Sequence, residues 1–280
     1  MSIINMSGLL RKAEDGFYGI GAFNVANMEM IMGAVQAAEE LKSPIILQVA
    51  QVRLPYSPLH MLGPMMVEAA KASTVPIAVQ LDHGTDLETI QHALDIGFSS
   101  VMIDASHLPI EENIKMVQKV KEMTRAYEAT VEAEVGQLAG SEGDAADQAM
   151  LHSDPLHVEM LYQKAGPDAI ALSIGNAHGL YKKEPRLQFN LLLEAKKRVP
   201  IPLVLHGGSG ISDEDFRKCI AGGMRKINIA TATFRSVEHS VRGYCQTEEN
   251  DYFKMSKAMV EGAYENVYRH IKLFQSDNKA

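Results

Sequence analysis

The sequence has few cysteines, no long apolar run and no excess of positive charge. Its two cysteines, Cys219 and Cys245, lie in helix-like stretches without the spacing of metal ligands. They are therefore predicted to be reduced packing residues. No apolar run approaches the roughly 20 residues that a membrane span requires, so a membrane partner is not expected. The formal net charge of -8 argues against a nucleic-acid partner, so any bound anion must be held locally.

The amino-terminal stretch "MSIINMSGLLRKAEDG" also lacks the features of a secretory signal. Charged residues and glycine follow too soon for an apolar segment and a cleavage site, so a cytoplasmic location is expected. Apolar residues make up 46% and charged residues 22% of the 280 residues, as in ordinary globular proteins. This length suffices for one large core, and α/β barrels of this size form one domain.

Eight short apolar runs alternate with amphipathic stretches along the chain. The runs are "YGIGAFNV", "IILQVA", "IAVQLDH", "VMID", "TVEAEV", "AIALSI", "PLVLH" and "KINIAT". They are apolar almost throughout, which is typical of parallel strands covered on both faces. The stretches between them, such as "NMEMIMGAVQAAEELK", place apolar residues at helical spacing. Eight β-then-α units favour an α/β fold, a (β/α)8 TIM barrel that forms a single domain over residues 1–280 and ends in a helical extension.

An open, doubly wound sheet is the alternative architecture, because periodicity does not show whether a sheet closes. The turn after the first run lacks the GxGxxG pattern of a dinucleotide fold, which favours the barrel. One long polar segment, "GQLAGSEGDAADQAM" at residues 136–150, follows the fifth run. A loop of this length in a compact domain is usually functional or disordered, and we expect a mobile active-site loop here.

Polar residues gather at the carboxyl ends of the predicted strands, where barrel enzymes place their chemistry. They are Asn24, Asp82, His83, Asp104, Glu134, Asn176, His178, His206 and Asn228. The histidines outside this set fall in predicted helices or loops and are expected to be surface or capping residues. These are His60, His92, His107, His152, His157, His239 and His270.

His83, His178 and His206 follow the third, sixth and seventh predicted strands. Imidazoles brought together from separate strands supply the three protein ligands and the open position of a catalytic zinc site. A single histidine is more often an ordinary polar residue, but three at separate strand ends favour the metal site. Asp82 directly precedes His83, and it either orients a neighbouring histidine or reaches the substrate as a general acid or base.

Two polar turns follow the last two predicted strands, where barrels frequently bind phosphate. The first, "HGGSG", offers backbone N–H groups and the hydroxyl of Ser209 beside the start of a helix. The second, "NIATAT", adds Asn228 and Thr231. The glycines of the first turn also fit a tight connection between strand and helix. Because the two turns occur together, a phosphate site is the favoured interpretation.

Several segments of the chain resemble class II, metal-dependent ketose-bisphosphate aldolases, the family of fructose- and tagatose-bisphosphate aldolases. They stand in the family's order from one end of the chain to the other: "AFNVANMEM", "LDHG", "SVMIDASHLPIEENI", "VEAEVGQLAG", "GNAHGLY", "PLVLHGGSGIS" and "KINIAT". The resemblance implies a TIM-barrel enzyme that cleaves a ketose phosphate reversibly into dihydroxyacetone phosphate and an aldehyde. Zinc would stabilise the enediolate that forms when the C3–C4 bond breaks.

The same resemblance implies a role for each matching residue. His83, His178 and His206 would hold the catalytic zinc, and Asp104 and Glu134 would support an alternative or second cation position. Asp82 would be the acid/base on the C4 oxygen. Glu142 would move a proton at C3, although a lone glutamate in a polar loop is usually a solvated charge. The predicted substrate-binding residues are Asn24, Gly179, Gly207, Gly208, Ser209, Asn228, Ala230 and Thr231. Family members also use a monovalent cation, Na+ or K+, at the phosphate site, and they form homodimers or homotetramers.

The sequence departs from the family where the far end of the substrate is expected. Bisphosphate aldolases of this type commonly carry Asp-Pro-Arg near the carboxyl terminus, and the arginine reaches the distal phosphate in a neighbouring subunit. Here Phe253 stands at that position, and Ala50 replaces a serine that many relatives carry. Arg53 could compensate from the same loop as Ala50. The sequence therefore predicts an unusual aldehyde, one that lacks a phosphate or carries a different acidic group.

Two other functions are weighed against the aldolase. A non-catalytic barrel subunit that stabilises an aldolase would not need an intact histidine set, and here the three histidines, Asp82 and Glu142 are all present. A metal-dependent barrel hydrolase is disfavoured because the first predicted strand lacks a His-x-His pair.

Overall fold

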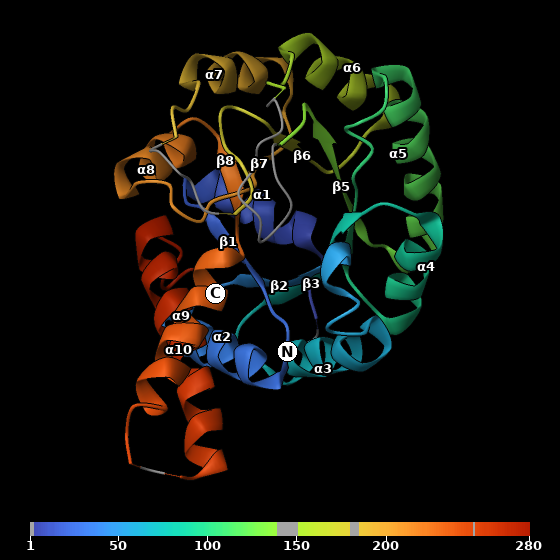
Figure 1. Ribbon diagram of the computed structural model, residues 1–280. Helices are drawn as coiled ribbons and strands as arrows, with labels where there is room; N and C mark the ends of the chain where they lie inside the picture. Colours follow the sequence, from blue (N-terminus) through green and yellow to red (C-terminus); the bar gives the residue numbers. More distant parts are fainter. Residues whose placement is uncertain (1–2, 139–150, 180–184, 249) are drawn as a thin grey trace.

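The computed structural model describes residues 3–138, 151–179, 185–248 and 250–280, and Figure 1 shows how they are arranged. Eight parallel strands close into a barrel in the order β1 to β8. They are β1 (Ile20–Asn24), β2 (Ile45–Ala50), β3 (Ile77–Gly84), β4 (Ser100–Ile103), β5 (Thr130–Val135), β6 (Ala169–Leu172), β7 (Leu203–Leu205) and β8 (Met224–Ile229). The pairing of β8 with β1 completes the barrel, so the predicted single-domain TIM barrel is confirmed.

Helices alternate with the strands and ring the barrel (Figure 1). They are α1 (Met6–Gly16), α2 (Met28–Glu40), α3 (Leu59–Ala72), α4 (Leu87–Ile96), α5 (Ile110–Thr124), α6 (Pro155–Ala165), α7 (Phe189–Arg198), α8 (Asp213–Ala221), α9 (Thr231–Tyr244) and α10 (Tyr252–Phe274). Short 3-10 segments follow β2 and α5, as η1 (Gln51–Arg53) and η2 (Arg125–Tyr127). Most of the predicted active-site loop at residues 136–150 lies outside the described residues.

The strands are buried on both faces. Every residue of β1 to β8 is buried except His83, which is partly exposed near the end of β3. The outward side chains pack beneath the helices, and the inward ones fill the barrel. This two-sided burial explains why the strands read as continuous apolar runs and not as alternating patterns.

Helix α1 closes the amino-terminal end of the barrel. Met6, Leu9 and Leu10 on its apolar face are fully buried against inward side chains that include Ile20 and Ile46. Burial of each such side chain contributes about 1.5–3 kcal/mol. The alternation of strand and helix does not predict this helix, because it precedes the first strand and lies across the barrel end.

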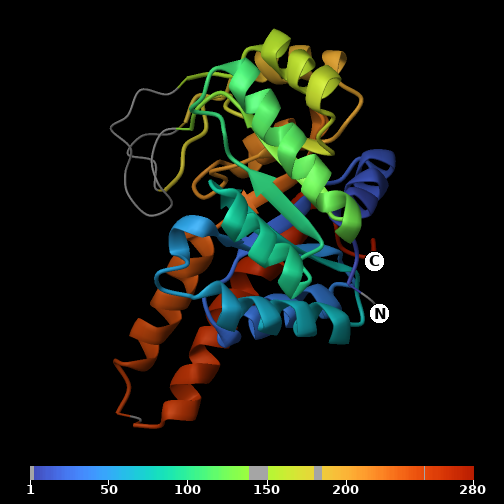
Figure 2. The same cartoon turned by 90° about the vertical axis from the view of Figure 1, so that its right-hand side faces the viewer.

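Helices α9 and α10 form a hairpin that extends beyond the ring of helices in both views (Figures 1 and 2). Asp251 caps α10 by accepting hydrogen bonds from the backbone N–H groups of Phe253 and Lys254, at 2.8 and 3.2 Å. Tyr252 and Phe253 at the start of α10 are 67% and 81% exposed. The far end of the hairpin therefore presents two aromatic rings to solvent.

Two expectations about single residues need correction. His270 is not a surface or capping residue: it is buried on α10 near the rings of Phe23, Phe216 and Phe274. Its Nδ1 donates to the carbonyl of Asn266, four residues earlier, at 2.7 Å, so the imidazole needs no water. Burial lowers the pKa of His270 to about 4, so this ring is neutral. Both cysteines are free, but only Cys219 packs in the core, because Cys245 is exposed.

Among the described residues, no helix is both long and apolar enough to span a bilayer.

Candidate active site

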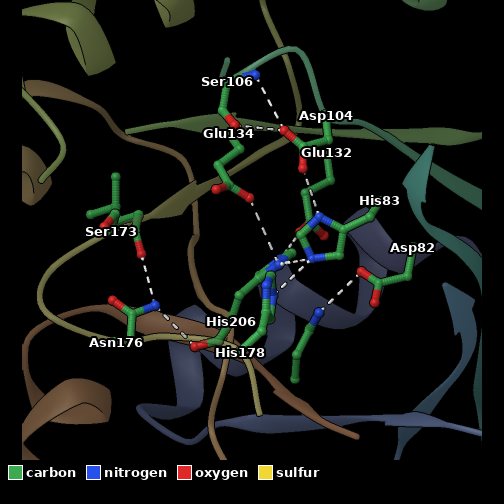
Figure 3. A network of polar contacts seen from close by, with 12 residues as sticks. Asp82, His83, Asp104, Ser106, Glu132, Glu134, Ser173, Asn176, His178 and His206 are labelled. Atoms are coloured by element: carbon green, nitrogen blue, oxygen red, sulfur yellow. Dashed lines mark hydrogen bonds and ion pairs between the residues drawn. The ribbon is translucent and has the colours of Figure 1, made fainter. Parts of the chain in front are cut away.

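Three imidazole rings meet at the mouth of the barrel, where they point toward one another (Figure 3). His83 lies near the end of β3, His178 follows β6, and His206 comes directly after β7. Nε2 of His83 lies 3.1 Å from Nε2 of His178 and 2.8 Å from Nδ1 of His206. One ligand atom from each ring lies within 4.8 Å of the others, so the three could hold a single metal ion.

The backbone at His83 explains how two adjacent residues both reach the mouth. In a regular strand Asp82 and His83 would point to opposite faces. His83 instead has a φ of 45°, in the left-handed region that residues other than glycine rarely adopt. The pairing of β3 with β4 shifts register at this point, between Leu81 and Gly84. The strained residue therefore turns its ring toward the other histidines, and its strain lies at the candidate site.

A carboxylate stands behind two of the three rings. Nδ1 of His83 lies 2.8 Å from Oδ2 of Asp104, and Nε2 of His206 lies 2.7 Å from Oε1 of Glu132. Asp104 also accepts hydrogen bonds at Oδ1 from the backbone and hydroxyl of Ser106 (Figure 3). Carboxylates in these positions receive the proton of one ring nitrogen and leave the other nitrogen free to face a metal. The nitrogens left free are Nε2 of His83 and Nδ1 of His206.

The short contacts between the rings require a proton on His83. Nδ1 of His206 must accept, because its Nε2 donates to Glu132, and Nε2 of His83 must therefore donate. Burial alone would lower the pKa of His83, but the charge of Asp82 and the hydrogen bond to Asp104 raise it well above its usual value. Burial and the neighbouring charge of His83 lower the pKa of His178 to about 3. Of these two rings, His83 is therefore the one that favours an additional proton.

Glu134 faces the same point with an oxygen that has no hydrogen-bond partner among the described residues. Its Oε2 lies 3.8 Å from Nδ1 of His206. Burial and the charge of Asp104 raise the pKa of Glu134 well above its usual value. Together with His83 and Asp104 it forms a second group of ligand atoms within 4.8 Å. A buried, unpaired carboxylate oxygen beside three imidazoles suits a divalent cation.

Asp82 is held by amides, not by an imidazole. It is fully buried, and its Oδ2 accepts hydrogen bonds from Asn24 and Gln48, both at 3.2 Å. Its Oδ1 accepts from Asn228 at 3.1 Å. Burial alone would raise the pKa of Asp82, but nearby His83, His206 and Lys226 lower it below its usual value. This arrangement favours an ionised Asp82 aimed at a substrate over one that orients a histidine, the alternative that the sequence left open.

One buried ion pair beneath the rings escaped the sequence interpretation. Nζ of Lys226 lies 2.8 Å from Oε2 of Glu132, and both side chains are fully buried. Gln80 donates to the same oxygen at 2.8 Å. Residues two apart in a strand share a face. Glu132 therefore shares a face with Glu134, and Lys226 shares one with Asn228, and this spacing could have predicted the ion pair. The rule that barrel enzymes place their chemistry at the strand ends does not predict this pair, because both residues lie below those ends.

The predicted phosphate-binding residues line one small cleft beside His178. The cleft is formed by His178, Gly179, Gly207, Gly208, Ser209, Asn228, Ala230 and Thr231. The hydroxyl of Ser209 accepts a hydrogen bond from the backbone N–H of Ala232 at 2.9 Å and joins the two turns. α9 begins at Thr231, which lines the cleft, so the positive end of the helix dipole lies at the cleft. The next two N–H groups already have partners, because Ala232 donates to Ser209 and Thr233 to the carbonyl of Ala230.

Close packing accounts for the glycines of the first turn. Gly207 has a φ of 60°, and a Cβ there would overlap the carbonyl oxygen of Ala177. A Cβ at Gly208 would lie 2.7 Å from the carbonyl oxygen of Asn228. The tight connection and the phosphate cleft are thus compatible. Asn176 supports this region from behind, because its side chain donates to the carbonyl of His206 at 2.9 Å.

The residues that were considered for the far end of the substrate lie in different parts of the structure. Ala50 is buried at the end of β2, and Arg53 follows in η1 with its guanidinium 5.9 Å from the ring centre of Phe234. Phe253 lies at the exposed end of the α9–α10 hairpin. Glu142, the remaining catalytic candidate, lies outside the described residues.

Comparison with known proteins identifies the family of the chain. Residues 4–279 match the family described as "Fructose-bisphosphate aldolase class-II". The chain is 37% identical to "Probable fructose-bisphosphate aldolase" of Bacillus subtilis over the full length of both. It is 35% identical to "6-phospho-5-dehydro-2-deoxy-D-gluconate aldolase" of Halalkalibacterium halodurans, with 100% of this chain and 99% of that protein covered. The crystal structure of the YdjI aldolase from Escherichia coli K12 covers 99% of both chains with a TM-score of 0.90 and 32% identity.

A closed (β/α)8 barrel with imidazoles and carboxylates at its mouth defines a metal-dependent barrel enzyme. The chain belongs to the class II fructose-bisphosphate aldolase family and is a class II aldolase, an aldehyde-lyase. Zinc dependence is general in this family, and the donor set described above suits such an ion.

Proposed function

We propose that the protein cleaves a ketose phosphate reversibly into dihydroxyacetone phosphate and an aldehyde at the mouth of the barrel. The observation that carries the proposal is the convergence of His83, His178 and His206 beside a cleft lined by the two phosphate-binding turns. One substrate can reach both places, because His178 belongs to the histidine cluster and to the cleft.

The three histidines would hold one zinc ion through Nε2 of His83, Nε2 of His178 and Nδ1 of His206. When bound, zinc supplies the positive charge that stabilises the negative charge developing as the C3–C4 bond breaks. Asp104 and Glu132 would keep His83 and His206 in the required orientation through their hydrogen bonds. Glu134, with Asp104, would serve an alternative or second cation position.

Asp82 would act as the base in cleavage and the acid in condensation. Cleavage requires removal of the proton from the C4 hydroxyl, and an ionised carboxylate can accept it. Its lowered pKa keeps Asp82 ionised at neutral pH, and three amide donors fix its orientation. Glu142 would move the proton at C3; it lies outside the described residues, and this role rests on the family resemblance.

The cleft beside His178 would hold the phosphate of dihydroxyacetone phosphate. The positive end of the α9 dipole and the hydroxyl of Ser209 would attract the phosphate, while Asn228 and Thr231 add polar side chains. Asn24 would contribute through its contact with Asp82. The monovalent cation, the homodimer or homotetramer and the cytoplasmic location predicted from the sequence belong to the same proposal.

The aldehyde half of the substrate would be unusual. Phe253 cannot bind a phosphate, and loss of one charge-assisted contact removes about 1.5–3 kcal/mol, enough to shift preference by about tenfold or more. Arg53 follows β2 at the mouth and could bind an acidic group of another kind. Relatives of nearly equal identity carry the names of different substrates, one a fructose bisphosphate and one a phosphorylated gluconate. Membership of the family therefore does not settle the choice.

A coupled assay for release of dihydroxyacetone phosphate tests this function. The panel contains fructose and tagatose 1,6-bisphosphates, ketose 1-phosphates of several lengths, and ketose 1-phosphates with a carboxylate at the far end. We expect zinc-dependent release, with kcat/KM higher for a substrate that lacks a distal phosphate. A clear preference for either bisphosphate would show that the departure at Phe253 has been over-interpreted. No release from any member would favour the non-catalytic subunit instead.

A further inference from the structure

The buried layer directly beneath the histidines contains the ion pair of Lys226 with Glu132. Lys226, Glu132, Gln80 and His206 are all fully buried. Each oxygen of Glu132 has its own partners. Oε2 faces Nζ of Lys226 and Nε2 of Gln80, both at 2.8 Å, and Oε1 faces Nε2 of His206 at 2.7 Å. This layer takes no direct part in the proposed reaction, so its charges need another explanation.

The two carboxylate oxygens of Glu132 face different kinds of partner. On the Oε2 side, Lys226 has only N–H groups to offer, so the atom there must be an acceptor. On the Oε1 side, the imidazole of His206 can either donate or accept, according to which ring nitrogen carries the proton. With a carboxylate, both ends accept, so His206 must donate from Nε2 and leave Nδ1 without a proton. Nδ1 is the nitrogen that faces His83 and His178.

We propose that Lys226 and Glu132 are positioning residues that fix the tautomer of His206, so that Nδ1 presents its lone pair to the metal. Glu132 sets the tautomer directly, because both of its oxygens accept. Lys226 requires an acceptor at the Oε2 position, so it prevents residue 132 from turning a donor toward it. The inference rests on the proposed role of His206 as a zinc ligand. It adds that a side chain behind the ring, which does not itself bind the metal, decides which ring nitrogen of His206 is available.

The substitution Glu132→Gln reverses this polarity with almost no change in shape. Lys226 and Gln80 both donate toward the Oε2 position, so the amide oxygen of the new glutamine must lie there. Its NH2 group then faces Nε2 of His206, which must accept. The imidazole proton moves to Nδ1, where it obstructs the metal. We expect zinc affinity to fall by about tenfold to a hundredfold, as for other groups that orient a metal ligand.

Adding Lys226→Met to this variant should restore part of the affinity. Without the lysine, the carboxamide of Gln80 is the remaining donor toward the Oε2 position among the described residues. The Oε1 of Gln80 has no hydrogen-bond partner among the described residues, so this carboxamide can turn and become the acceptor. The glutamine at position 132 can then turn its oxygen to His206. Lys226→Met alone leaves the carboxylate in place, and a much smaller loss of affinity is expected.

The measurement is the dissociation constant for zinc, obtained at one pH by competition with a chromophoric chelator. Wild type, Lys226→Met, Glu132→Gln and the double variant are compared after circular dichroism confirms that each is folded. Gln80→Met is the matched control, because it removes a neutral donor to the same oxygen without changing polarity. If the ion pair only supported the fold, both single variants would leave a buried charge unpaired and lose affinity alike. That result, or unchanged affinity in Glu132→Gln, would overturn the inference.

Nitrogen NMR of the metal-free protein with labelled histidine provides a test whose wild-type result does not depend on the folding of any variant. The chemical shifts of the two ring nitrogens of His206 report which one carries the proton, and loss of the signals in His206→Ala assigns them. We expect a proton on Nε2 in wild type and on Nδ1 in Glu132→Gln. A wild-type ring protonated at Nδ1 alone contradicts the inference. Failure of the proposed function would look different, because the zinc-loaded wild type would then release no dihydroxyacetone phosphate, whatever the tautomer of His206.

Discussion

Replacement of Asp82 by asparagine separates acid/base chemistry from metal binding. Asp82 accepts three hydrogen bonds from amides, and none of its partners is an imidazole. The new NH2 group can take the place of Oδ1, opposite Asn228 alone. The Oδ1 of Asn228 has no hydrogen-bond partner among the described residues, so a half-turn of that amide lets it accept. Asp82→Asn therefore keeps the buried network paired.

The expected magnitudes differ for stability and for catalysis. Keeping the network paired limits the loss of stability to about 1 kcal/mol, whereas Asp82→Ala would leave each buried donor unpaired at about 1–3 kcal/mol. General acid/base catalysis contributes about a hundredfold to ten-thousandfold, so kcat for cleavage should fall by that factor. This is an increase of about 3–5 kcal/mol in the activation barrier. The turned Asn228 also alters the phosphate cleft, so KM is determined separately.

The assay combines three readouts on the same zinc-loaded preparation. Zinc content by atomic absorption should remain at the wild-type level, and release of dihydroxyacetone phosphate should be lost. Exchange of the C3 proton of added dihydroxyacetone phosphate should continue, because it does not involve the C4 oxygen. An Asp82→Asn protein that has lost its zinc would refute the reasoning, since Asp82 would then be a support for the metal site.

Three further predictions concern the metal and the proton at C3. Chelation should abolish activity, and added zinc should restore it. His206→Ala should bind no zinc. Full activity of a verified metal-free protein would contradict the metal site. Because the pKa of His83 is raised well above its usual value, zinc that binds at Nε2 must displace the proton that this ring favours. Calorimetry in buffers of different ionisation enthalpy should show that at least one proton is released when zinc binds. The affinity for zinc should weaken as the pH falls. Zinc binding without proton release would refute this prediction. Glu142→Ala should lose exchange of the C3 proton but keep zinc and phosphate affinity, and unchanged exchange would identify Glu142 as a solvated loop charge.

The barrel and the meeting of the histidines could be predicted because both depend on regular geometry. Parallel strands that close into a barrel bring their carboxyl ends to one rim, so residues such as His83 and His206 meet although they are 123 positions apart. The two turns that form the phosphate cleft follow from the same rule. Whether these residues perform the proposed roles depends on the experiments above.

Other features depend on contacts that no local pattern encodes. The φ of His83 arises from a register shift between β3 and β4, and it decides that Asp82 and His83 share the mouth. His270 is buried because rings from β1, α8 and its own helix surround it, and a carbonyl four residues earlier accepts its hydrogen bond. In both cases the local sequence permits the observed conformation without requiring it.

The closure of the barrel by α1 makes its interior a well with a single opening. Met6, Leu9 and Leu10 block the amino-terminal end with apolar side chains, and the layer of Glu132 and Lys226 above them is sealed from solvent. Among the described residues, the mouth is therefore the open side of the histidine cluster. A substrate bound there would lie between Asp82 and bulk water, so the proton that Asp82 accepts from the C4 hydroxyl in cleavage would leave the site only after the aldehyde has left.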